Sequence, residues 1–220
     1  MIDDGILLID KPDGMTSFGV VARIRRVLTK FYGKKIKVGH TGTLDPFATG
    51  LMILVIGKEC KNAGNYSKMD KVYEATFTLG KTSTTGDPEG ELSDYSDYKP
   101  SLQEIQLAIK KFTGEIIQSP PIFSAIKING QRAYDLARAG KQIEMPKRQV
   151  NIYELDLMEY EYPYLKVRAN VSSGTYIRTL AVDIGEFLKT GAYCSVLRRI
   201  SIDKWHIDSA KRLQDFNIND

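Results

Sequence analysis

Between Gly39 and Ile56 the chain reads GHTGTLDPFATGLMILVI, a glycine-rich turn that leads directly into an apolar run. The run Leu51–Ile56 is uninterrupted and of strand length, which predicts a buried central strand. Within the turn, Asp45 stands directly before Pro46, and a proline disfavours the helical conformation of the residue before it. The sequence therefore predicts a single carboxylate on a tight loop that is anchored on a rigid strand.

Three other interpretations of this part of the sequence are a connecting turn, a phosphoaspartate motif and a P-loop. An isolated Asp-Pro pair is more often part of a connecting turn than of a site. A phosphoaspartate motif of the P-type ATPase kind carries its aspartate before Lys-Thr-Gly-Thr, whereas Asp45 follows Thr-Gly-Thr. A P-loop ends in Gly-Lys-Ser/Thr, but Gly57-Lys58 is followed by Glu59. The loop thus fits neither of these phosphate chemistries.

Charge is unevenly distributed along the 220 residues, whose formal net charge is +4. The stretch 14–44 holds seven Lys and Arg residues and no acid, whereas the stretch 82–98 holds five acids and no base. A basic stretch beside the loop fits a polyanionic partner, because Lys and Arg contacts to phosphate supply most sequence-independent affinity for nucleic acids. A solvated helix face is the alternative.

Several classes of protein are disfavoured by composition. The two cysteines, Cys60 and Cys194, are far apart and show no paired-ligand spacing, which argues against a disulfide framework and a zinc site. With only His40 and His206, a site of several histidines is impossible. The N-terminus is unlike a signal peptide, and no apolar run approaches the roughly 18 residues of a membrane span. We therefore expect a cytoplasmic protein with no metal and no membrane association.

Hydrophobic periodicity predicts an α+β fold with a mixed, mostly antiparallel central sheet flanked by helices. A short apolar run predicts a strand near 6–9, and alternation predicts strands near 71–79, 150–157 and 165–171, the first of these with Tyr73, Ala75, Phe77 and Leu79 on one face. A last strand is expected near 193–202.

A first helix is expected up to Phe31, capped by Thr16 or Ser17, and its apolar positions recur at helical spacing: Val20, Ile24, Val27, Leu28 and Phe31. A second helix is expected from Ser101, which forms a capping-box pattern with Glu104, and it continues through Leu102, Ile105, Ile109 and Phe112. A third helix is expected over 176–188, and a short terminal helix is expected to be capped by Asp208 or Ser209.

We expect one domain over residues 1–220. It contains a Lys- and Arg-rich insertion at about 124–147 that could reach over a bound ligand, with a tight hairpin at Asn129-Gly130.

The string Gly39–Gly50 strongly resembles the signature of the TruB family of pseudouridine synthases. Four other places match that family's pattern, so that the resemblance runs from about Ile6 to Leu213. These places are Lys11-Pro12 with Gly14, Thr16 and Ser17; Tyr73 with the run Leu79–Asp87; Ser173–Leu180; and Leu197–Arg199. The resemblance implies a pseudouridine synthase-like fold.

The resemblance also implies roles for individual residues. Asp45 would be catalytic, Arg178 would pair with it, Tyr73 would stack on the target base and Leu197 would pack in the uracil pocket. His40 would lie near the flipped nucleotide, and Lys11 and Tyr176 would support the site. Each has a plainer alternative: a core tyrosine, a buried strand leucine, a histidine in a loop hydrogen bond. Arg178 is harder to explain this way. A cation in the first turn of a helix interacts unfavourably with the helix dipole, at a cost of about 0.3–1 kcal/mol.

The activity implied is the isomerisation of uridine to pseudouridine, and the family's target is uridine 55 in the T-arm loop of tRNA. The reaction exchanges one C–N bond for one C–C bond, so no cofactor is required. The enzyme must extrude the uridine to reach it. We expect a monomer whose contacts to the RNA backbone come from the basic helix and the insertion. The residues expected to make them are Arg23, Arg26, Lys30, Lys127, Arg138 and Lys141.

Two other functions stay open at this point. A non-catalytic RNA-binding protein or tRNA-folding chaperone could retain the scaffold without the reaction. A phosphoaspartyl hydrolase is disfavoured because no second acid accompanies Asp45. Bacterial members of the family usually carry a small RNA-binding domain after the catalytic one, and a chain ending at Asp220 has no room for it. A weaker grip on the tRNA would relax or shift the choice of RNA.

Overall fold

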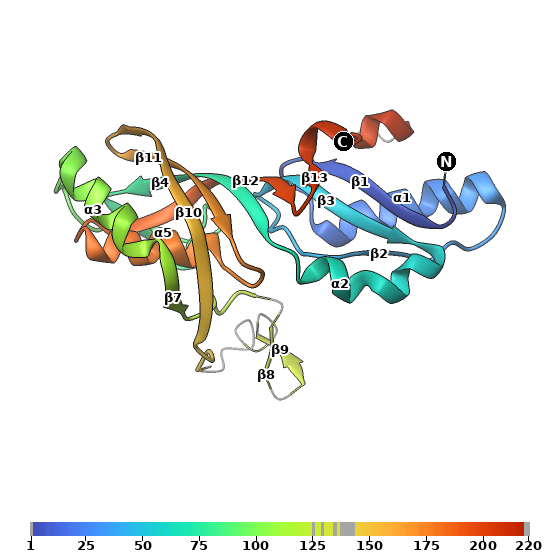
Figure 1. The fold of residues 1–220 in the computed structure, drawn as a ribbon, viewed down its shortest axis with the longest axis horizontal. Coiled ribbons are helices and arrows are strands. Elements are labelled where there is room, and N and C mark those ends of the chain that lie inside the picture. The colour runs from blue at the N-terminus through green and yellow to red at the C-terminus, as the bar shows by residue number, and fades with distance from the viewer. Residues whose placement is uncertain (1, 125, 129, 134–135, 137–143, 218–220) are drawn as a thin grey trace. The chain divides into compact units, whose positions relative to one another are not determined.

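The structure is a computed structural model that describes residues 2–124, 126–128, 130–133, 136 and 144–217 (Figure 1). Its Cα positions divide the chain into two compact units. The first unit contains Met1–Glu74 and Leu197–Asp220, and the second contains Ala75–Val196. The single catalytic domain expected from the sequence stays a prediction.

The first unit is a small sheet with one long helix and several short ones. Strand order is β1-β3-β12, with β2 beside β3 and β13 beside β12. The pairs β1–β3, β2–β3 and β12–β13 are antiparallel, whereas β12 pairs with β3 in parallel. The elements are β1 (Gly5–Lys11), α1 (Ser17–Tyr32), β2 (Val38–His40), β3 (Thr49–Ile56), η1 (Gly57–Asn62), α2 (Ala63–Ser67), β12 (Ala192–Ile202), β13 (Trp205–His206), η2 (Ile207–Ser209) and η3 (Leu213–Phe216).

Strand β3 is the centre of this unit, as the apolar run predicts. Every residue from Leu51 to Ile56 is almost fully buried. Leu51 and Ile53 pack with Ile202 on one side of the strand. Alternate residues of a strand point to opposite faces, so Met52 and Leu54 bury the other side. A strand covered on both faces is a rigid base for the loop that precedes it.

Helix α1 begins where local signals place it. The Thr16 hydroxyl accepts a hydrogen bond from the Gly19 N–H at 3.0 Å and caps the helix. Val20, Ile24 and Leu28 are buried, as the spacing predicts. Phe31, expected on the same face, is 58% exposed and contacts Tyr32 edge to face. That expectation was wrong because periodicity predicts the direction of a face but not where the core beneath it ends.

The second unit joins a sheet in the order β12-β4-β11-β10-β7 to helices α3 and α5. The pairs β10–β11 and β7–β10 are antiparallel, and α3 lies against β10 and α5 (Figure 1). The expected fold class, a mixed and mostly antiparallel sheet with helices, is confirmed. The elements are β4 (Lys71–Leu79), β5 (Lys81–Ser83), β6 (Leu92–Asp94), α3 (Leu102–Phe112), β7 (Gly114–Gln118), β8 (Lys127–Ile128), β9 (Gln131–Arg132), β10 (Arg148–Glu161), β11 (Tyr164–Val171) and α5 (Ile177–Phe187).

Local predictions in this unit are largely confirmed. Ser101 and Glu104 form the expected capping box at the start of α3, although Leu102 is largely exposed. Strands β8 and β9 pair antiparallel on either side of Gly130, which confirms a hairpin, while Asn129 lies outside the described residues.

The prediction of a short terminal helix capped by Asp208 or Ser209 was wrong. Asp208 and Ser209 lie inside the 3₁₀ turn η2, and a second 3₁₀ turn, η3, follows it. A continuous helix is prevented because the backbone between them pairs with β1. The Asp10 N–H donates to the Lys211 carbonyl at 2.9 Å, and the Lys211 N–H donates to the Leu8 carbonyl at 3.0 Å.

Candidate active site

Asp45 lies in the loop between β2 and β3, with its side chain half-buried. The backbone before it is held by Ser17 at the start of α1, whose hydroxyl donates to the Leu44 carbonyl at 2.9 Å and accepts from the Leu44 N–H at 2.8 Å. The backbone after it turns sharply, because the Ala48 N–H donates to the Asp45 carbonyl at 3.1 Å. The aspartate is thus presented by a backbone with little freedom.

Lys11 lies beneath the same loop. Its side chain is completely buried, and its ammonium donates to three main-chain carbonyls, those of Met15 at 2.6 Å, Pro12 at 2.8 Å and Pro46 at 3.0 Å. A charge removed from water has to regain its hydrogen bonds inside the protein, so these carbonyls are held as firmly as the ammonium. Because Pro46 directly follows Asp45, Lys11 and Ser17 fix the backbone on both sides of the carboxylate.

Arg199 ties the ends of the loop to β12. It is almost fully buried, and it donates from Nε to the Leu51 carbonyl at 2.6 Å and from Nη2 to the Gly42 carbonyl at 3.2 Å. Gly50 pairs with Arg199 and has a φ of 107°, and a Cβ atom there would overlap the Arg199 carbonyl oxygen. Only glycine fits this close approach. Arg199 belongs to the stretch Leu197–Arg199 that matches the family pattern, but no role in holding the loop was predicted for it.

His40 ends β2, five residues before Asp45, and pairs with Leu54. Its Nδ1 is buried and has no hydrogen-bond partner in the part of the chain that the structure describes. Burial and the nearby Arg199 charge lower the pKa of His40 below its usual value, so the ring is neutral at pH 7.

Strands β4 and β12 each have residues in both units, and Tyr73 of β4 and Leu197 of β12 belong to the first unit. Both are at least nine-tenths buried, and the alternation predicted around Tyr73 is confirmed by the burial of Ala75, Phe77 and Leu79. Burial of this kind is compatible with a core role as well as with an apolar wall of a base pocket.

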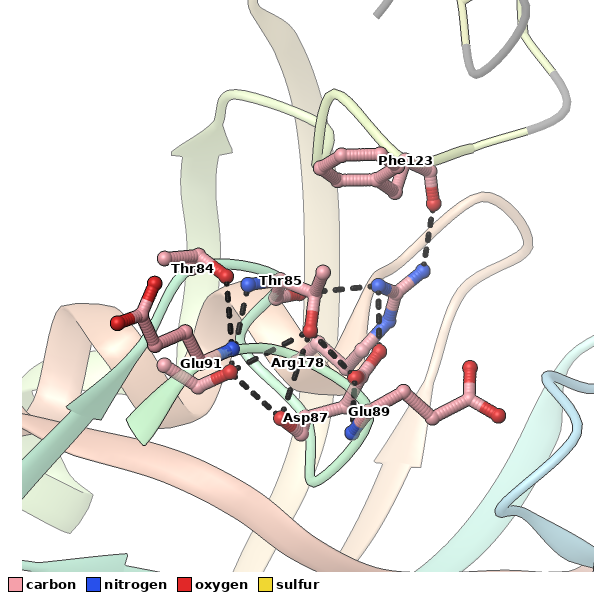
Figure 2. A network of polar contacts seen from close by, with 8 residues as sticks. Thr84, Thr85, Asp87, Glu89, Glu91, Phe123 and Arg178 are labelled. Atoms are coloured by element: carbon pink, nitrogen blue, oxygen red, sulfur yellow. Dashed lines mark hydrogen bonds and ion pairs between the residues drawn. The ribbon is translucent and has the colours of Figure 1, made fainter. Parts of the chain in front are cut away.

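Arg178 is the centre of a polar network in the second unit (Figure 2). Its Nη1 donates to the Asp87 carboxylate at 2.8 Å and to the Thr85 carbonyl at 3.0 Å, while Nη2 donates to the Phe123 carbonyl at 2.9 Å. The other oxygen of Asp87 accepts from the Thr85 hydroxyl at 2.5 Å and from the Glu89 N–H at 3.0 Å. Arg178 and Asp87 are both almost fully buried, so the ion pair is shielded from solvent.

Asp87 is a buried partner of Arg178 that was not predicted from the sequence. Arg178 was expected to have a distant partner, because a cation in the first turn of a helix opposes the dipole, and Asp45 was the candidate. Asp87, 91 residues away in sequence and within the same unit, supplies a carboxylate. Two signals in the sequence were its place in the acidic stretch 82–98 and its place at the end of the run Leu79–Asp87, which matches the family pattern. The pairing of Arg178 with Asp45 stays a prediction.

Tyr176 directly precedes α5 and is tied to the end of β7. Its N–H donates to the Gln118 side-chain carbonyl at 3.0 Å, and the Gln118 amide donates to the Tyr176 carbonyl at 3.2 Å. The Arg148 guanidinium lies 4.9 Å from the centre of the tyrosine ring. These contacts hold Tyr176 within the second unit.

The residues expected to contact the RNA backbone fall into two groups. Arg26 and Lys30 are exposed on α1, whereas Arg23 is only partly exposed and donates weakly, at 3.5 Å, to the Gly19 carbonyl of its own helix. Lys127 belongs to β8, and Arg138 and Lys141 lie outside the described residues. No helix in the described part of the chain is long and apolar enough to cross a membrane.

Known proteins resemble this chain over nearly its full length. A tRNA pseudouridine synthase B of Endomicrobium trichonymphae is 43% identical over 213 residues, which is 96% of this chain and 90% of that protein. One of Clostridium novyi (strain NT) is 44% identical over 220 residues, covering 99% of this chain and 74% of the relative.

Solved structures also resemble this chain over nearly its full length. The crystal structure of a Cbf5-Nop10-Gar1 complex superposes with a TM-score of 0.71 at 29% identity, covering 97% of this chain and 53% of that one. An H/ACA RNP bound to a substrate RNA containing 2'-deoxyuridine superposes equally well, with a TM-score of 0.71 at 28% identity, covering 97% of this chain and 52% of that one.

The family profile described as TruB family pseudouridylate synthase (N terminal domain) matches residues 25–177. That range includes the aspartate loop, Tyr73 and the start of the Arg178 segment. The family resemblance predicted from the motifs is confirmed, and the chain belongs to the TruB family of pseudouridine synthases.

Proposed function

We propose that this chain isomerises uridine to pseudouridine in tRNA, at uridine 55 of the T-arm loop, and that Asp45 is the essential residue. The observation that carries the proposal is the way in which the loop is built. Ser17 holds Leu44 and Lys11 holds Pro46, so that the one carboxylate between them has a fixed backbone. Names of relatives such as the Endomicrobium tRNA pseudouridine synthase B support the choice of tRNA as substrate.

The reaction breaks the bond from C1' to N1 and forms one from C1' to C5, with no net loss of atoms. Asp45 would attack uracil C6, attack ribose C1' or remove a ribose proton, and each of these steps needs an ionised carboxylate at a defined position. Arg178 would keep it ionised, because a nearby cation lowers the pKa of a carboxyl group.

Once the uridine is extruded from the RNA, the protein has to hold the base. Tyr73 and Leu197 would provide the surface for the base, His40 would lie near the nucleotide, and Lys11 and Tyr176 would support the site. The neutral state of His40 fits this assignment, because a neutral ring adds no charge near the carboxylate. The backbone of the RNA would be bound by Arg23, Arg26, Lys30, Lys127, Arg138 and Lys141.

The chain would act as one catalytic domain, as a monomer and in the cytoplasm. The two free cysteines fit a reducing compartment. Light scattering of the purified chain tests the monomer.

The decisive experiment uses T-arm RNA tritiated at C5 of the target uridine, since pseudouridine formation releases that tritium to water. We expect release by the unmodified chain and none above background by Asp45→Asn, with RNA affinity retained. Asp97→Asn, at an exposed position of the second unit, is the matched control and should react normally. Appreciable release by Asp45→Asn would remove Asp45 from its role. RNA binding without release by the unmodified chain would favour a non-catalytic RNA-binding protein or chaperone.

A further inference from the structure

The outer side of α1 carries an open groove of about 450 Å³. It is formed by helix positions three or four residues apart, which lie on one side of a helix, and by one residue of the loop that follows. We call it the α1 groove. Its lining residues are Ala22, Arg25, Arg26, Thr29, Lys30 and Lys35.

The α1 groove is strongly and uniformly positive. Four of its six lining residues are cations, and none is acidic. Within the described part of the chain none of these four cations forms an ion pair, although Lys34 nearby reaches Asp3 at 3.8 Å. Like charges one helical turn apart repel each other by about 0.2–0.5 kcal/mol per pair. A bound anion would remove this repulsion.

An exposed aromatic ring continues the same side of α1. Phe18 lies one turn before Ala22, its side chain is 63% exposed, and the Arg25 guanidinium is 5.8 Å from the centre of its ring. Phe18 is also adjacent to Ser17, which holds the backbone beside Asp45. Aromatic rings next to a positively charged groove are the arrangement with which proteins bind single-stranded nucleic acids, because bases stack on the ring while cations contact phosphates.

We infer that the α1 groove binds the sugar-phosphate backbone of RNA and that Phe18 stacks on a base of the same strand, outside the target uridine. The inference rests on the proposed function only for the choice of RNA. With a rise of about 1.5 Å per residue, Lys30 lies about 20 Å along the helix axis from Ser17. The groove would therefore engage nucleotides that are several positions away from the uridine at Asp45.

This assignment differs from the expectation based on sequence. It adds Phe18, Arg25 and Lys35 to the surface that binds RNA. It also separates Arg23, which lines a different hollow with Met15 and Gly19 at the start of α1.

The test compares two triple variants that remove the same charge. One is Arg26→Gln, Lys30→Gln and Lys35→Gln in the groove, and the other is Lys58→Gln, Lys61→Gln and Lys68→Gln, at exposed positions of the same unit that do not line it. Binding of T-arm RNA is measured from low to moderate salt. Each lost phosphate contact lowers the slope of log K against log salt by about 0.7 for single strands and about 0.9 for duplex.

We expect the groove variant to lose about two units of that slope and at least tenfold in affinity near physiological salt, while the control triple keeps the slope of the unmodified chain. Equal slopes for the two triples would overturn the groove as an RNA site. Both proteins are first checked for an unchanged unfolding temperature, so that a folding defect is not mistaken for lost binding.

Phe18→Leu and Phe18→Tyr test the stacking. Loss of a stacked base weakens binding about fivefold or more, so we expect that loss for leucine and little change for tyrosine. Equal affinities for all three chains would exclude Phe18 from the site. All of these titrations read binding without turnover. If the unmodified chain released no tritium while the groove variant still lost its slope, the proposed reaction would fail and the groove would stand.

Discussion

Cations are used in two opposite ways in this chain. Lys11, Arg199 and Arg178 are buried, and each donates to main-chain carbonyls of the loops that carry candidate site residues. The cations of the α1 groove remain in water, and within the described residues they have no carboxylate partner. A buried charge must replace every hydrogen bond that it loses from water, whereas an exposed one stays available to a ligand. The first group fixes geometry, and the second is suited to bind an external anion.

The largest effect should come from removing the counter-ion of a buried cation. In Asp87→Asn one oxygen of the side chain is replaced by an amide N–H₂ that faces the Arg178 guanidinium, so two donors oppose each other. Breaking a buried ion pair from one side costs about 3–5 kcal/mol of unfolding free energy. Urea unfolding should show this loss, and Asp94→Asn, which removes an exposed partner of Lys81, should change stability by less than about 1 kcal/mol.

A double-mutant cycle that combines Asp87→Asn with Arg178→Met tests whether the two side chains depend on each other. Once the guanidinium is gone, Asp87→Asn has no donor to oppose, so the double variant should be much more stable than the sum of the single losses implies. Additive losses would show that the two side chains do not depend on each other. Stability is the measurement here because Arg178 is also a candidate site residue.

Lys11 and Lys30 test the comparison with one substitution at two places. Lys11→Met removes the donor of three main-chain carbonyls, of which the Met15 hydrogen bond is buried and the Pro12 and Pro46 hydrogen bonds are partly buried. An unsatisfied buried group costs about 1–3 kcal/mol, and a partly buried carbonyl that water can reach costs less. We expect a loss of about 2–4 kcal/mol, accompanied by slower release of tritium. Lys30→Met on the exposed side of α1 should stay within about 0.5 kcal/mol. Similar losses at both positions would contradict the distinction between positioning and binding cations.

Contacts between residues close in sequence could be predicted from the sequence, whereas contacts between residues far apart in sequence could not. The Thr16 cap and the Ser101 capping box involve residues three positions apart, and both were predicted. The alternation of β4 and the apolar run of β3 are likewise local, and they placed Tyr73 and the loop of Asp45.

Contacts that join distant residues had no such signal. Ser17 and Leu44 are 27 residues apart, and Lys11 and Pro46 are 35 apart, so only a family motif pointed to Lys11. Asp87 was counted in an acidic stretch, where charges are usually solvated. It is buried because Arg178 reaches it from α5, and no pattern within either segment encodes that meeting.

Ser17→Ala should have a moderate effect. The substitution removes the hydroxyl that both donates to and accepts from Leu44, which leaves a buried N–H and a buried carbonyl unpaired. We expect a loss of about 1–3 kcal/mol and a lower rate of tritium release, because the backbone before Asp45 is less restrained. Ser67→Ala removes an exposed hydroxyl bound to the Gly64 carbonyl and is the control, with little effect on either measurement. An unchanged rate for Ser17→Ala would show that Lys11 alone positions the loop.

The smallest effect concerns His40, which lies beside the buried Arg199 rather than among exposed cations. Burial and that charge lower the pKa of His40 in the folded chain, whereas in the unfolded chain it stays near its ordinary value of about 6.5. Between these two values the unfolded state binds more protons, so the free energy of unfolding falls as the pH drops below about 6.5. His40→Gln should lose less stability between pH 7 and pH 5 than the unmodified chain does. If His40→Gln lost as much stability as the unmodified chain, the pKa of His40 would not be lowered on folding, and neither burial nor the Arg199 charge would act on the ring.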